Sequence, residues 1–321
     1  MSAAMPATLA EPVESAQIAD GGDLRSLLGE LSTAAGALAA LAAAFNARTR
    51  GAPLAPSLAA PVRGVLDALG MSETVDRLPV DELRGLLAEI RVFGGSHRRL
   101  AAREPPLPGW QPPDADFIQA AGDVSAGLPR VLARRVAPRL EGLSARLELL
   151  GARFLDVGAG AAALSVEMAR TWPRLTIVGL EPWAPALELG RLNVRAAGLG
   201  DRIELRGECG EQLADEASYD LAWIPSLFIA EPALRAVVER VWRALRDGGW
   251  LLLPVLRADA GSLAGSVVRL RSALWGGSAP TLSEAAALLS SAGFVDLQSF
   301  ASAPTSATGL LAARRAPASR G

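Results

Sequence analysis

The sequence contains no lysine, so arginine supplies all 32 of its basic side chains, against 34 acidic ones. This absence excludes a phosphate-binding G-x-x-x-x-G-K-[ST] loop and any lysine acting as a general base. The formal net charge of −2 gives no basic footprint for nucleic acid, so we expect no nucleic-acid partner. We attribute the missing lysines to codon bias rather than to chemistry.

Cysteine and histidine each occur once, as Cys209 and His97. A single cysteine excludes an internal disulfide and fits a reducing compartment. One cysteine and one histidine do not fill a tetrahedral zinc site, although carboxylates are further ligands in principle. The sequence therefore predicts a protein without a bound metal.

Long apolar runs are also scarce. The main alanine-leucine run, Ala34 to Phe45, is too short to span a bilayer, and Gly36 interrupts it. Residues 1–20 carry three acidic side chains and no arginine, which opposes a secretory or mitochondrial address. We therefore expect a cytoplasmic protein without membrane association, with a disordered tail at 1–22 and a flexible tail at 316–321.

The length of 321 residues predicts two domains. Residues 23–144 show helical patterning throughout, and an apolar stripe from Leu83 to Ile90 follows Asp81, the expected cap of that helix. Proline clusters at 53–61 and 105–113 separate the helices. A helical domain at 23–144 is thus expected before an α/β domain at 145–315.

The most informative segment is FLDVGAG at 154–160, followed by VGLE ending at Glu181. It reads as a strand, a glycine turn, a helix and a second strand that ends in a carboxylate. Gly158 and Gly160 permit a sharp turn and the close approach of a ligand. Glu181 stands where the ribose of a bound nucleoside would lie, and a carboxylate accepts hydrogen bonds from both ribose hydroxyls.

The same glycines also satisfy the dinucleotide pattern G-x-G-x-x-G/A, so a nicotinamide cofactor is an alternative. Asp156 decides between the two ligands, because an anion at the mouth of the turn repels a pyrophosphate. It suits a ligand that carries an ammonium group and a sulfonium, as S-adenosylmethionine does.

The downstream order extends the α/β pattern. Further strands are expected at 202–206, 219–224 and 250–255, and a helix with apolar residues from Leu234 to Leu245 is expected to close at Gly248 and Gly249. Thr281 to Glu284 form a capping box before a helix that ends at Gly293. Segments 294–300 and 308–313 complete the set as two final strands.

With these motifs in order, the segment from Ala145 onward resembles the class I S-adenosylmethionine-dependent methyltransferases. The resemblance implies a Rossmann-like seven-stranded sheet with an antiparallel last strand, here preceded by an all-helical domain. It also implies that the residue matching Asp156 positions the methionine end, that matching Glu181 holds the ribose, and that matching Glu208 or Cys209 touches adenine. Ala162 replaces the third glycine of the family's G-x-G-x-G.

In this family, helical additions before the first strand commonly cover the cofactor crevice and shape the substrate pocket, and in some members they form dimers. We expect the same lid role here, with a stability domain as the alternative and a homodimer as a further expectation. The implied activity is methyl transfer to an oxygen or nitrogen atom of a small molecule, and we expect the reaction to belong to secondary metabolism.

Candidate general bases are few. Family members that methylate phenols often carry a histidine after the fifth strand, where this chain has Arg257, Ala258 and Asp259. His97, on a flexible-looking segment, is the catalytic candidate. Trp223 and Ser226 follow the fourth strand and are candidate acceptor-binding residues, with simple packing as the alternative. The scarcity of bases leaves two other functions open: a methyltransferase-like protein with different chemistry or a scaffold role, and an NAD(P)-dependent oxidoreductase.

Overall fold

The computed structural model describes residues 21–102, 109–112, 114–259, 261–301 and 306–316. Residues 1–20 of the tail predicted at 1–22 and residues 317–321 of the tail predicted at 316–321 lie outside these ranges, as does most of the proline cluster at 105–113. Residues 21 and 22 are helical, so the first tail prediction is wrong at these two positions. The chain divides into two compact units, Met1–Leu78 and Pro79–Gly321, which are described separately here. Residues 79–144 group with the sheet-bearing unit, whereas the sequence-based boundary lies at 145.

Within residues 21–78, the described part of the first unit, the helices are α1 (Gly21–Arg50), α2 (Pro56–Ala68) and α3 (Ser72–Arg77). Proline occupies the first position of α2, where its missing N–H costs nothing. Arg48 of α1 donates a hydrogen bond to the Leu78 carbonyl at 3.0 Å, which ties the first helix to the end of the unit.

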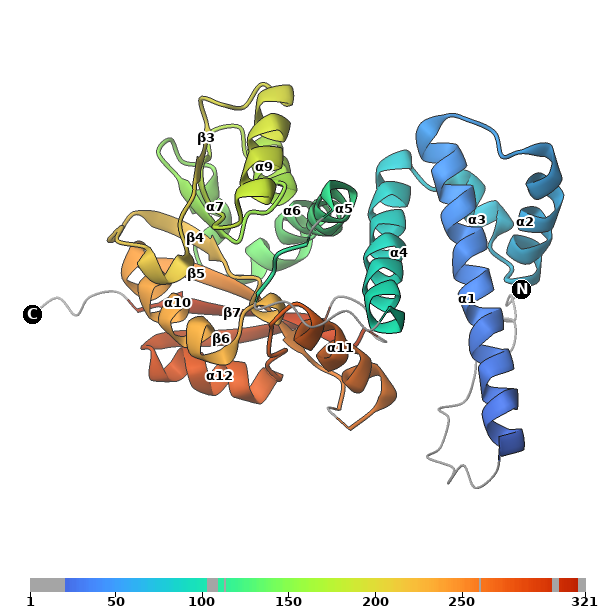
Figure 1. The fold of residues 1–321 in the computed structure, drawn as a ribbon. Helices are drawn as coiled ribbons and strands as arrows, with labels where there is room; N and C mark the ends of the chain where they lie inside the picture. The colour runs from blue at the N-terminus through green and yellow to red at the C-terminus, as the bar shows by residue number, and fades with distance from the viewer. Residues whose placement is uncertain (1–20, 103–108, 113, 260, 302–305, 317–321) are drawn as a thin grey trace, which may run out of the picture. The chain divides into compact units, whose positions relative to one another are not determined.

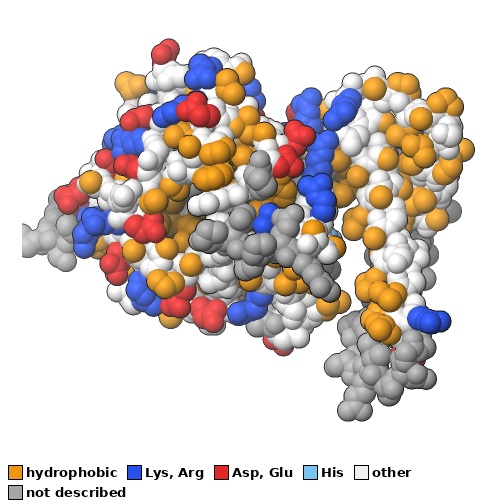
Figure 2. Space-filling model, in the orientation of Figure 1, with side chains coloured by type: hydrophobic (Ala, Val, Ile, Leu, Met, Phe, Trp, Pro, Cys, Tyr) orange, Lys and Arg blue, Asp and Glu red, His pale blue; other side chains and the backbone are white. Residues whose placement is uncertain are grey.

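Helix α1 is longer than the apolar run at 34–45 suggests. Its segment Asp23–Arg50 has the length and apolar composition of a membrane-crossing helix, with only 6% of the most apolar window buried. Its large exposed apolar side chains are Leu24, Leu28, Leu31 and Leu38. Figure 2 shows hydrophobic side chains, in orange, along this helix. Core helices of other proteins and signal sequences share this composition, so the helix by itself assigns no membrane location.

The second unit begins with a helical segment and continues as an α/β domain (Figure 1). Its helices are α4 (Val80–Ala101), α5 (Ala115–Ser125), α6 (Leu128–Val131), the π-helical turn η1 (Leu132–Val136), the 3₁₀ turn η2 (Ala137–Arg139), α7 (Leu143–Leu147), α8 (Ala163–Thr171), α9 (Ala184–Ala196), the 3₁₀ turns η3 (Gly210–Gln212) and η4 (Ser226–Phe228), α10 (Glu231–Ala244), α11 (Leu263–Leu274) and α12 (Leu282–Ser291).

Seven strands form one sheet in the order β3-β2-β1-β4-β5-β7-β6. The strands are β1 (Arg153–Val157), β2 (Thr176–Leu180), β3 (Ile203–Arg206), β4 (Tyr219–Trp223), β5 (Leu245–Leu256), β6 (Phe294–Ala301) and β7 (Thr308–Arg315). The first five strands are parallel, and β7 runs antiparallel to both β5 and β6. This order reverses direction between β1 and β4, which is where open α/β sheets bind ligands.

Two apolar layers cover the sheet. On one face, Phe154 of β1 packs with residues of η1, α7, α8 and α9. On the other face, Leu155 and Val157 pack with residues of α10 and α12. Because side chains alternate along a strand, Asp156 shares the face of Phe154 and points toward α8.

Two local expectations are wrong. Gly248 and Gly249 do not close α10, which ends at Ala244; they lie inside β5, where a Cβ atom on Gly249 would meet the Arg246 carbonyl oxygen at 2.8 Å. Asp81 does not cap α4, since the helix begins at Val80 with no side-chain cap. The capping box of Thr281 and its helix are confirmed.

Candidate functional site

The glycine turn and Glu181 meet at the carboxyl edge of the sheet because β1 and β2 are parallel neighbours in register. Val157 lies opposite Leu180, and the Ala159 N–H donates to the Leu180 carbonyl at 2.9 Å. The two motifs recognised in the sequence therefore form one crevice wall.

The turn adopts a left-handed backbone at three positions. Gly158, Gly160 and Ala162 have φ values of 67°, 55° and 59°. Alanine tolerates this region at a cost of about 1–2 kcal/mol, so neighbouring groups must hold the turn in shape. A Cβ atom on Gly158 would lie 3.0 Å from Pro225 Cγ, and one on Gly160 would lie 3.8 Å from the Trp110 ring.

Glu181 is buried, with 3% of its surface exposed. One carboxylate oxygen accepts the Gly160 N–H and the other accepts the Trp183 N–H, each at 2.8 Å. Burial raises the pKa of this carboxyl, and the two backbone N–H groups oppose that rise. Each oxygen retains a free lone pair, so the carboxylate holds the glycine turn and still accepts two further hydrogen bonds.

Asp156 is 1% exposed and accepts a hydrogen bond from Ser165 Oγ at 2.6 Å. The pKa of this carboxyl is raised to about 7. Burial is the largest cause, the Ser165 hydrogen bonds partly oppose the rise, and the nearby Glu181 charge adds to it. The carboxyl thus fixes the first turn of α8 in this structure. Its predicted contact with the methionine end of a cofactor stays a prediction.

Neither acid has a cationic partner: in the described parts of the chain, no ion pair joins Asp156 or Glu181 to an arginine. Buried carboxylates are normally paired, because an unpaired buried charge is costly. When the two carboxyls are ionised, they place negative charge in the crevice that a cationic ligand would neutralise.

Glu208 and Cys209 follow β3 as predicted. Glu208 lies 3.7 Å from Arg206 in an ion pair, and the Cys209 N–H donates to Gln212 Oε1 at 3.2 Å. Burial, followed by the charges of Glu211 and Glu181, raises the pKa of the half-buried Cys209 thiol. A thiol of raised pKa is a poor nucleophile. The raised pKa therefore suits the predicted packing of Cys209 against adenine better than a covalent role.

The two acceptor-site candidates stand at the end of β4. Trp223 is half-buried and lies opposite Asp156 in the β1–β4 register. Ser226 is fully buried and donates its hydroxyl proton to the Pro254 carbonyl. This contact favours the packing alternative for Ser226. Trp223 also packs against the apolar core on the Phe154 face, but it is only partly buried.

His97 lies within α4 and is exposed. The prediction of a flexible segment around His97 is wrong, because Gly94 and Gly95 continue the helix. A Cβ atom on Gly95 would lie 2.6 Å from the Phe117 ring, so the glycine lets α5 pack closely against α4. The catalytic role of His97 stays a prediction.

Two tryptophans at the crevice were not predicted. Trp110 packs with Ala161 and Trp183 beside the glycine turn, and the Trp183 indole N–H donates to the Pro112 carbonyl at 3.4 Å. Trp110 also contacts a second apolar cluster from α4, α5, α11 and η4, which contains Val92, Phe117, Ala120, Phe228, Leu274 and Trp275. The sequence signal for Trp110 was its place inside a proline-rich connection, PPLPGWQPP, and that for Trp183 was its place two residues after Glu181.

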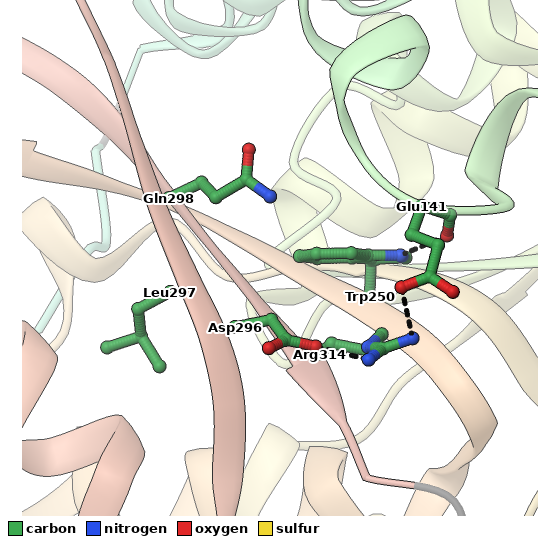
Figure 3. Close-up of a pocket in the computed structure, with 6 residues that line it drawn as sticks. All are labelled: Glu141, Trp250, Asp296, Leu297, Gln298 and Arg314. Carbon is green, nitrogen blue, oxygen red and sulfur yellow. Dashed lines mark hydrogen bonds and ion pairs between the residues drawn. The ribbon is translucent and has the colours of Figure 1, made fainter.

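A cavity of about 300 Å³ lies elsewhere, against β5, β6 and β7 (Figure 3). Its lining residues are Glu141, Trp250, Asp296, Leu297, Gln298 and Arg314. The Arg314 guanidinium is already paired with the carboxylates of Glu141 and Asp296. None of the predicted site residues lines this cavity, so it is separate from the crevice.

Residues 154–249 match a family model described as a methyltransferase domain. The ubiquinone biosynthesis O-methyltransferase of Xanthomonas euvesicatoria pv. vesicatoria is 34% identical over 132 residues, which cover 40% of this chain and 54% of that protein. The chain thus spans about half the length of the curated relatives it matches. For residues 154–249, the predicted resemblance to class I methyltransferases is confirmed.

Solved structures resemble nearly the whole chain. The pyocyanin biosynthetic protein PhzM has a TM-score of 0.59 at 18% identity, covering 92% of this chain and 100% of its own. Human N-acetylserotonin methyltransferase in complex with SAM has a TM-score of 0.56 at 16% identity, covering 93% of this chain and 99% of its own. These similarities confirm the predicted fold, including the helical segment before the sheet.

Proposed function

We propose that this chain, in which residues 154–249 form a class I methyltransferase domain, transfers the methyl group of S-adenosylmethionine to an oxygen atom of a small molecule. Oxygen is favoured over nitrogen because the curated relatives are named as O-methyltransferases. The name of PhzM, a biosynthetic protein, supports a role in secondary metabolism. The cytoplasmic location and the homodimer expected from the sequence stay proposals.

One observation carries the proposal: two buried acids without arginine partners flank a left-handed glycine turn. The free lone pairs of Glu181 match the two hydroxyls of a ribose. Asp156 adds a second negative charge that favours a sulfonium and an ammonium group over a pyrophosphate. These residues fit S-adenosylmethionine, and they fit a dinucleotide less well.

S-adenosylmethionine, when bound, would supply a sulfonium methyl group that passes in line to the acceptor nucleophile as the carbon–sulfur bond breaks, with S-adenosylhomocysteine as the leaving group. The chain contributes orientation and the exclusion of water. Gly158 and Gly160 would admit the ligand against the backbone, and Glu181 would hold the ribose. Trp223, at the end of β4, would line the crevice on the side from which the acceptor approaches the methyl group.

The described residues near the crevice offer no obvious general base. Burial raises the pKa of the Cys209 thiol, which disfavours its thiolate form. Tyr219 lies at the amino end of β4 and donates its hydroxyl proton to Asp215. Catalysis by proximity and orientation is therefore the simplest mechanism, with His97 as the candidate base if the acceptor binds in its protonated form. The His97→Ala variant tests this role, because loss of a general base lowers kcat by roughly a hundredfold or more while cofactor affinity is retained.

The full chain would be incubated with S-adenosylmethionine labelled in its methyl group and a panel of phenols, catechols and heterocyclic amines. We expect the label to appear in an acceptor, and Glu181→Ala to reduce its transfer. Binding of S-adenosylhomocysteine without transfer to any acceptor would favour the scaffold alternative. Tight binding of a dinucleotide and not of S-adenosylhomocysteine would favour an oxidoreductase.

A further inference from the structure

The side chain of Asn193 in α9 holds the glycine turn by a hydrogen bond. The Asn193 amide nitrogen donates one hydrogen bond to the Ala161 carbonyl and another to Gln119 Oε1, both at 2.9 Å. A side-chain amide has two N–H donors, so both are used. Asn193 therefore connects the turn to helix α5, which precedes the sheet in the chain.

Gln119 is itself fixed in orientation. Its amide nitrogen donates to Asp123 Oδ1 at 2.7 Å, so its oxygen must face Asn193. A carboxylate and a backbone carbonyl, which only accept, stand at the two ends of the chain of hydrogen bonds. Asn193 therefore donates in both directions, to the Ala161 carbonyl and to Gln119, and Gln119 in turn donates to Asp123.

Close packing accompanies these hydrogen bonds. A Cβ atom on Gly122 of α5 would lie 3.0 Å from Ala161 Cβ, and one on Gly190 of α9 would lie 2.8 Å from the Gly160 carbonyl oxygen. Gly122 is three residues after Gln119, and Asn193 is three residues after Gly190. In each helix, the glycine and the amide side chain therefore occupy one face, which rests on the turn.

The turn depends on such support because left-handed residues persist only where their surroundings fix them. Glu181 accepts a hydrogen bond from the Gly160 N–H, and Asn193 donates one to the Ala161 carbonyl. The turn is thus fixed by side chains from two different parts of the chain. Loss of the second contact would leave the peptide between Ala161 and Ala162 with one hydrogen bond, from the Ala162 N–H to the Ala159 carbonyl at 2.8 Å. This peptide precedes Ala162, which has a φ of 59°.

We propose that Asn193 is a positioning residue for cofactor binding and that Gln119 orients it, so that helix α5 sets part of the nucleoside affinity without touching the nucleoside. This inference rests on the proposed cofactor site. It assigns a role in cofactor binding to the helical segment, in addition to the lid role expected from the sequence.

The test is a double-mutant cycle on the full chain, with S-adenosylhomocysteine affinity measured by calorimetry. We expect Asn193→Ala to weaken binding about tenfold and Gln119→Ala about threefold, as for loss of one or part of one buried hydrogen bond. In the Asn193→Ala background, Gln119→Ala should weaken binding no further. The control is Arg191→Ala on the same helix, whose exposed side chain pairs only with Glu188.

Two further readouts separate positioning from stability. Hydrogen–deuterium exchange at residues 158–162 should accelerate in Asn193→Ala and not in Arg191→Ala, while thermal unfolding without ligand shows that both variants are folded at the assay temperature. A purely structural role would lower the unfolding midpoint and leave the dissociation constant of the folded protein unchanged, which would overturn the proposal.

An equal effect of Gln119→Ala in both backgrounds would also overturn it, because the two side chains would then act independently. If the wild-type chain binds S-adenosylhomocysteine and Asn193→Ala binds it equally well, this inference alone fails. If the wild-type chain binds neither S-adenosylhomocysteine nor S-adenosylmethionine, the proposed function fails and this inference fails with it.

Discussion

The pKa of Asp156 predicts that S-adenosylmethionine binds more tightly as pH rises through neutrality. The buried carboxyl has a pKa of about 7 without ligand. A cationic ligand binds the ionised form, so its affinity follows the ionised fraction. With that pKa, the fraction rises from about 0.1 at pH 6 to about 0.9 at pH 8, which makes the dissociation constant about tenfold smaller.

Calorimetry between about pH 6 and pH 8, in buffers of different ionisation enthalpy, measures both the affinity and the protons released on binding. Asp156→Asn is the matched control, because it keeps the size of the side chain and removes its titration. We expect the variant to lose most of the pH dependence. A wild-type dissociation constant that stays constant over this range, or an equal slope in Asp156→Asn, would refute the reasoning.

The same group affects the stability of the free protein with the opposite dependence on pH. Its folded pKa is raised above the unfolded value of 3.8, so the folded state binds more protons between those two pKa values. Stability is therefore highest below about pH 4 for this group and falls as pH rises to about 7, by at most about 4 kcal/mol. Urea unfolding of the wild type and of Asp156→Asn across this window measures the difference.

Three further substitutions test other parts of the structure. Glu181→Ala should weaken S-adenosylhomocysteine binding at least about tenfold, and an unchanged dissociation constant in calorimetry would contradict the ribose assignment. Asp220→Ala should lower the free energy of unfolding by about 3 kcal/mol, because it leaves two arginines without their buried partner; a loss below about 1 kcal/mol in urea titrations would show that the arginines find water instead. Gly277→Ala should cost at least about 2 kcal/mol, since its Cβ atom would lie 2.0 Å from the Leu227 carbonyl oxygen. Its control, Gly94→Ala, has nothing within 4 Å and should be neutral or stabilising in the same titration.

The sheet and its cofactor edge could be predicted because their signals are local. Strand β1 and the glycine turn are specified by one short segment, and Glu181 ends the next strand. Parallel neighbours end at the same edge, so two motifs about twenty residues apart meet without further information. The antiparallel β7 came from the family resemblance, because strand patterning does not give the direction of a final strand.

The mistaken glycine assignments share one physical cause. Gly248 and Gly249 were assigned to a helix end, and Gly94 with Gly95 to a flexible segment, since sequence alone shows glycine only as a breaker. In the structure, Gly249 admits the neighbouring backbone and Gly95 admits the Phe117 ring. The Tyr219 carbonyl, 3.1 Å from a Cβ atom on Gly249, and the Phe117 ring beside Gly95 are both distant in sequence, so no local pattern contains them.

The helical contribution to the crevice was hidden for the same reason. Trp110 and Gln119 lie more than forty residues before Gly160, and their patterns read only as a proline-rich connection and an ordinary helix. Their functions appear only when α5 is seen to lie on the turn. Side chains that support a site from another element are in general less visible in a sequence than the motif they support.

The placement of arginine along the sheet supports the cofactor assignment independently of any motif. Asp220, near the amino end of β4, lies close to Arg146 and Arg246 at 3.5 and 2.6 Å and accepts the Arg153 N–H at 3.0 Å. Asp156, on the neighbouring strand, is equally buried and has only a serine as partner. Since this chain supplies two arginines to one acid of the sheet, a shortage of basic residues does not explain why no described arginine pairs with Asp156. An unpaired acid costs stability, and a positively charged ligand bound at that edge would compensate for this cost.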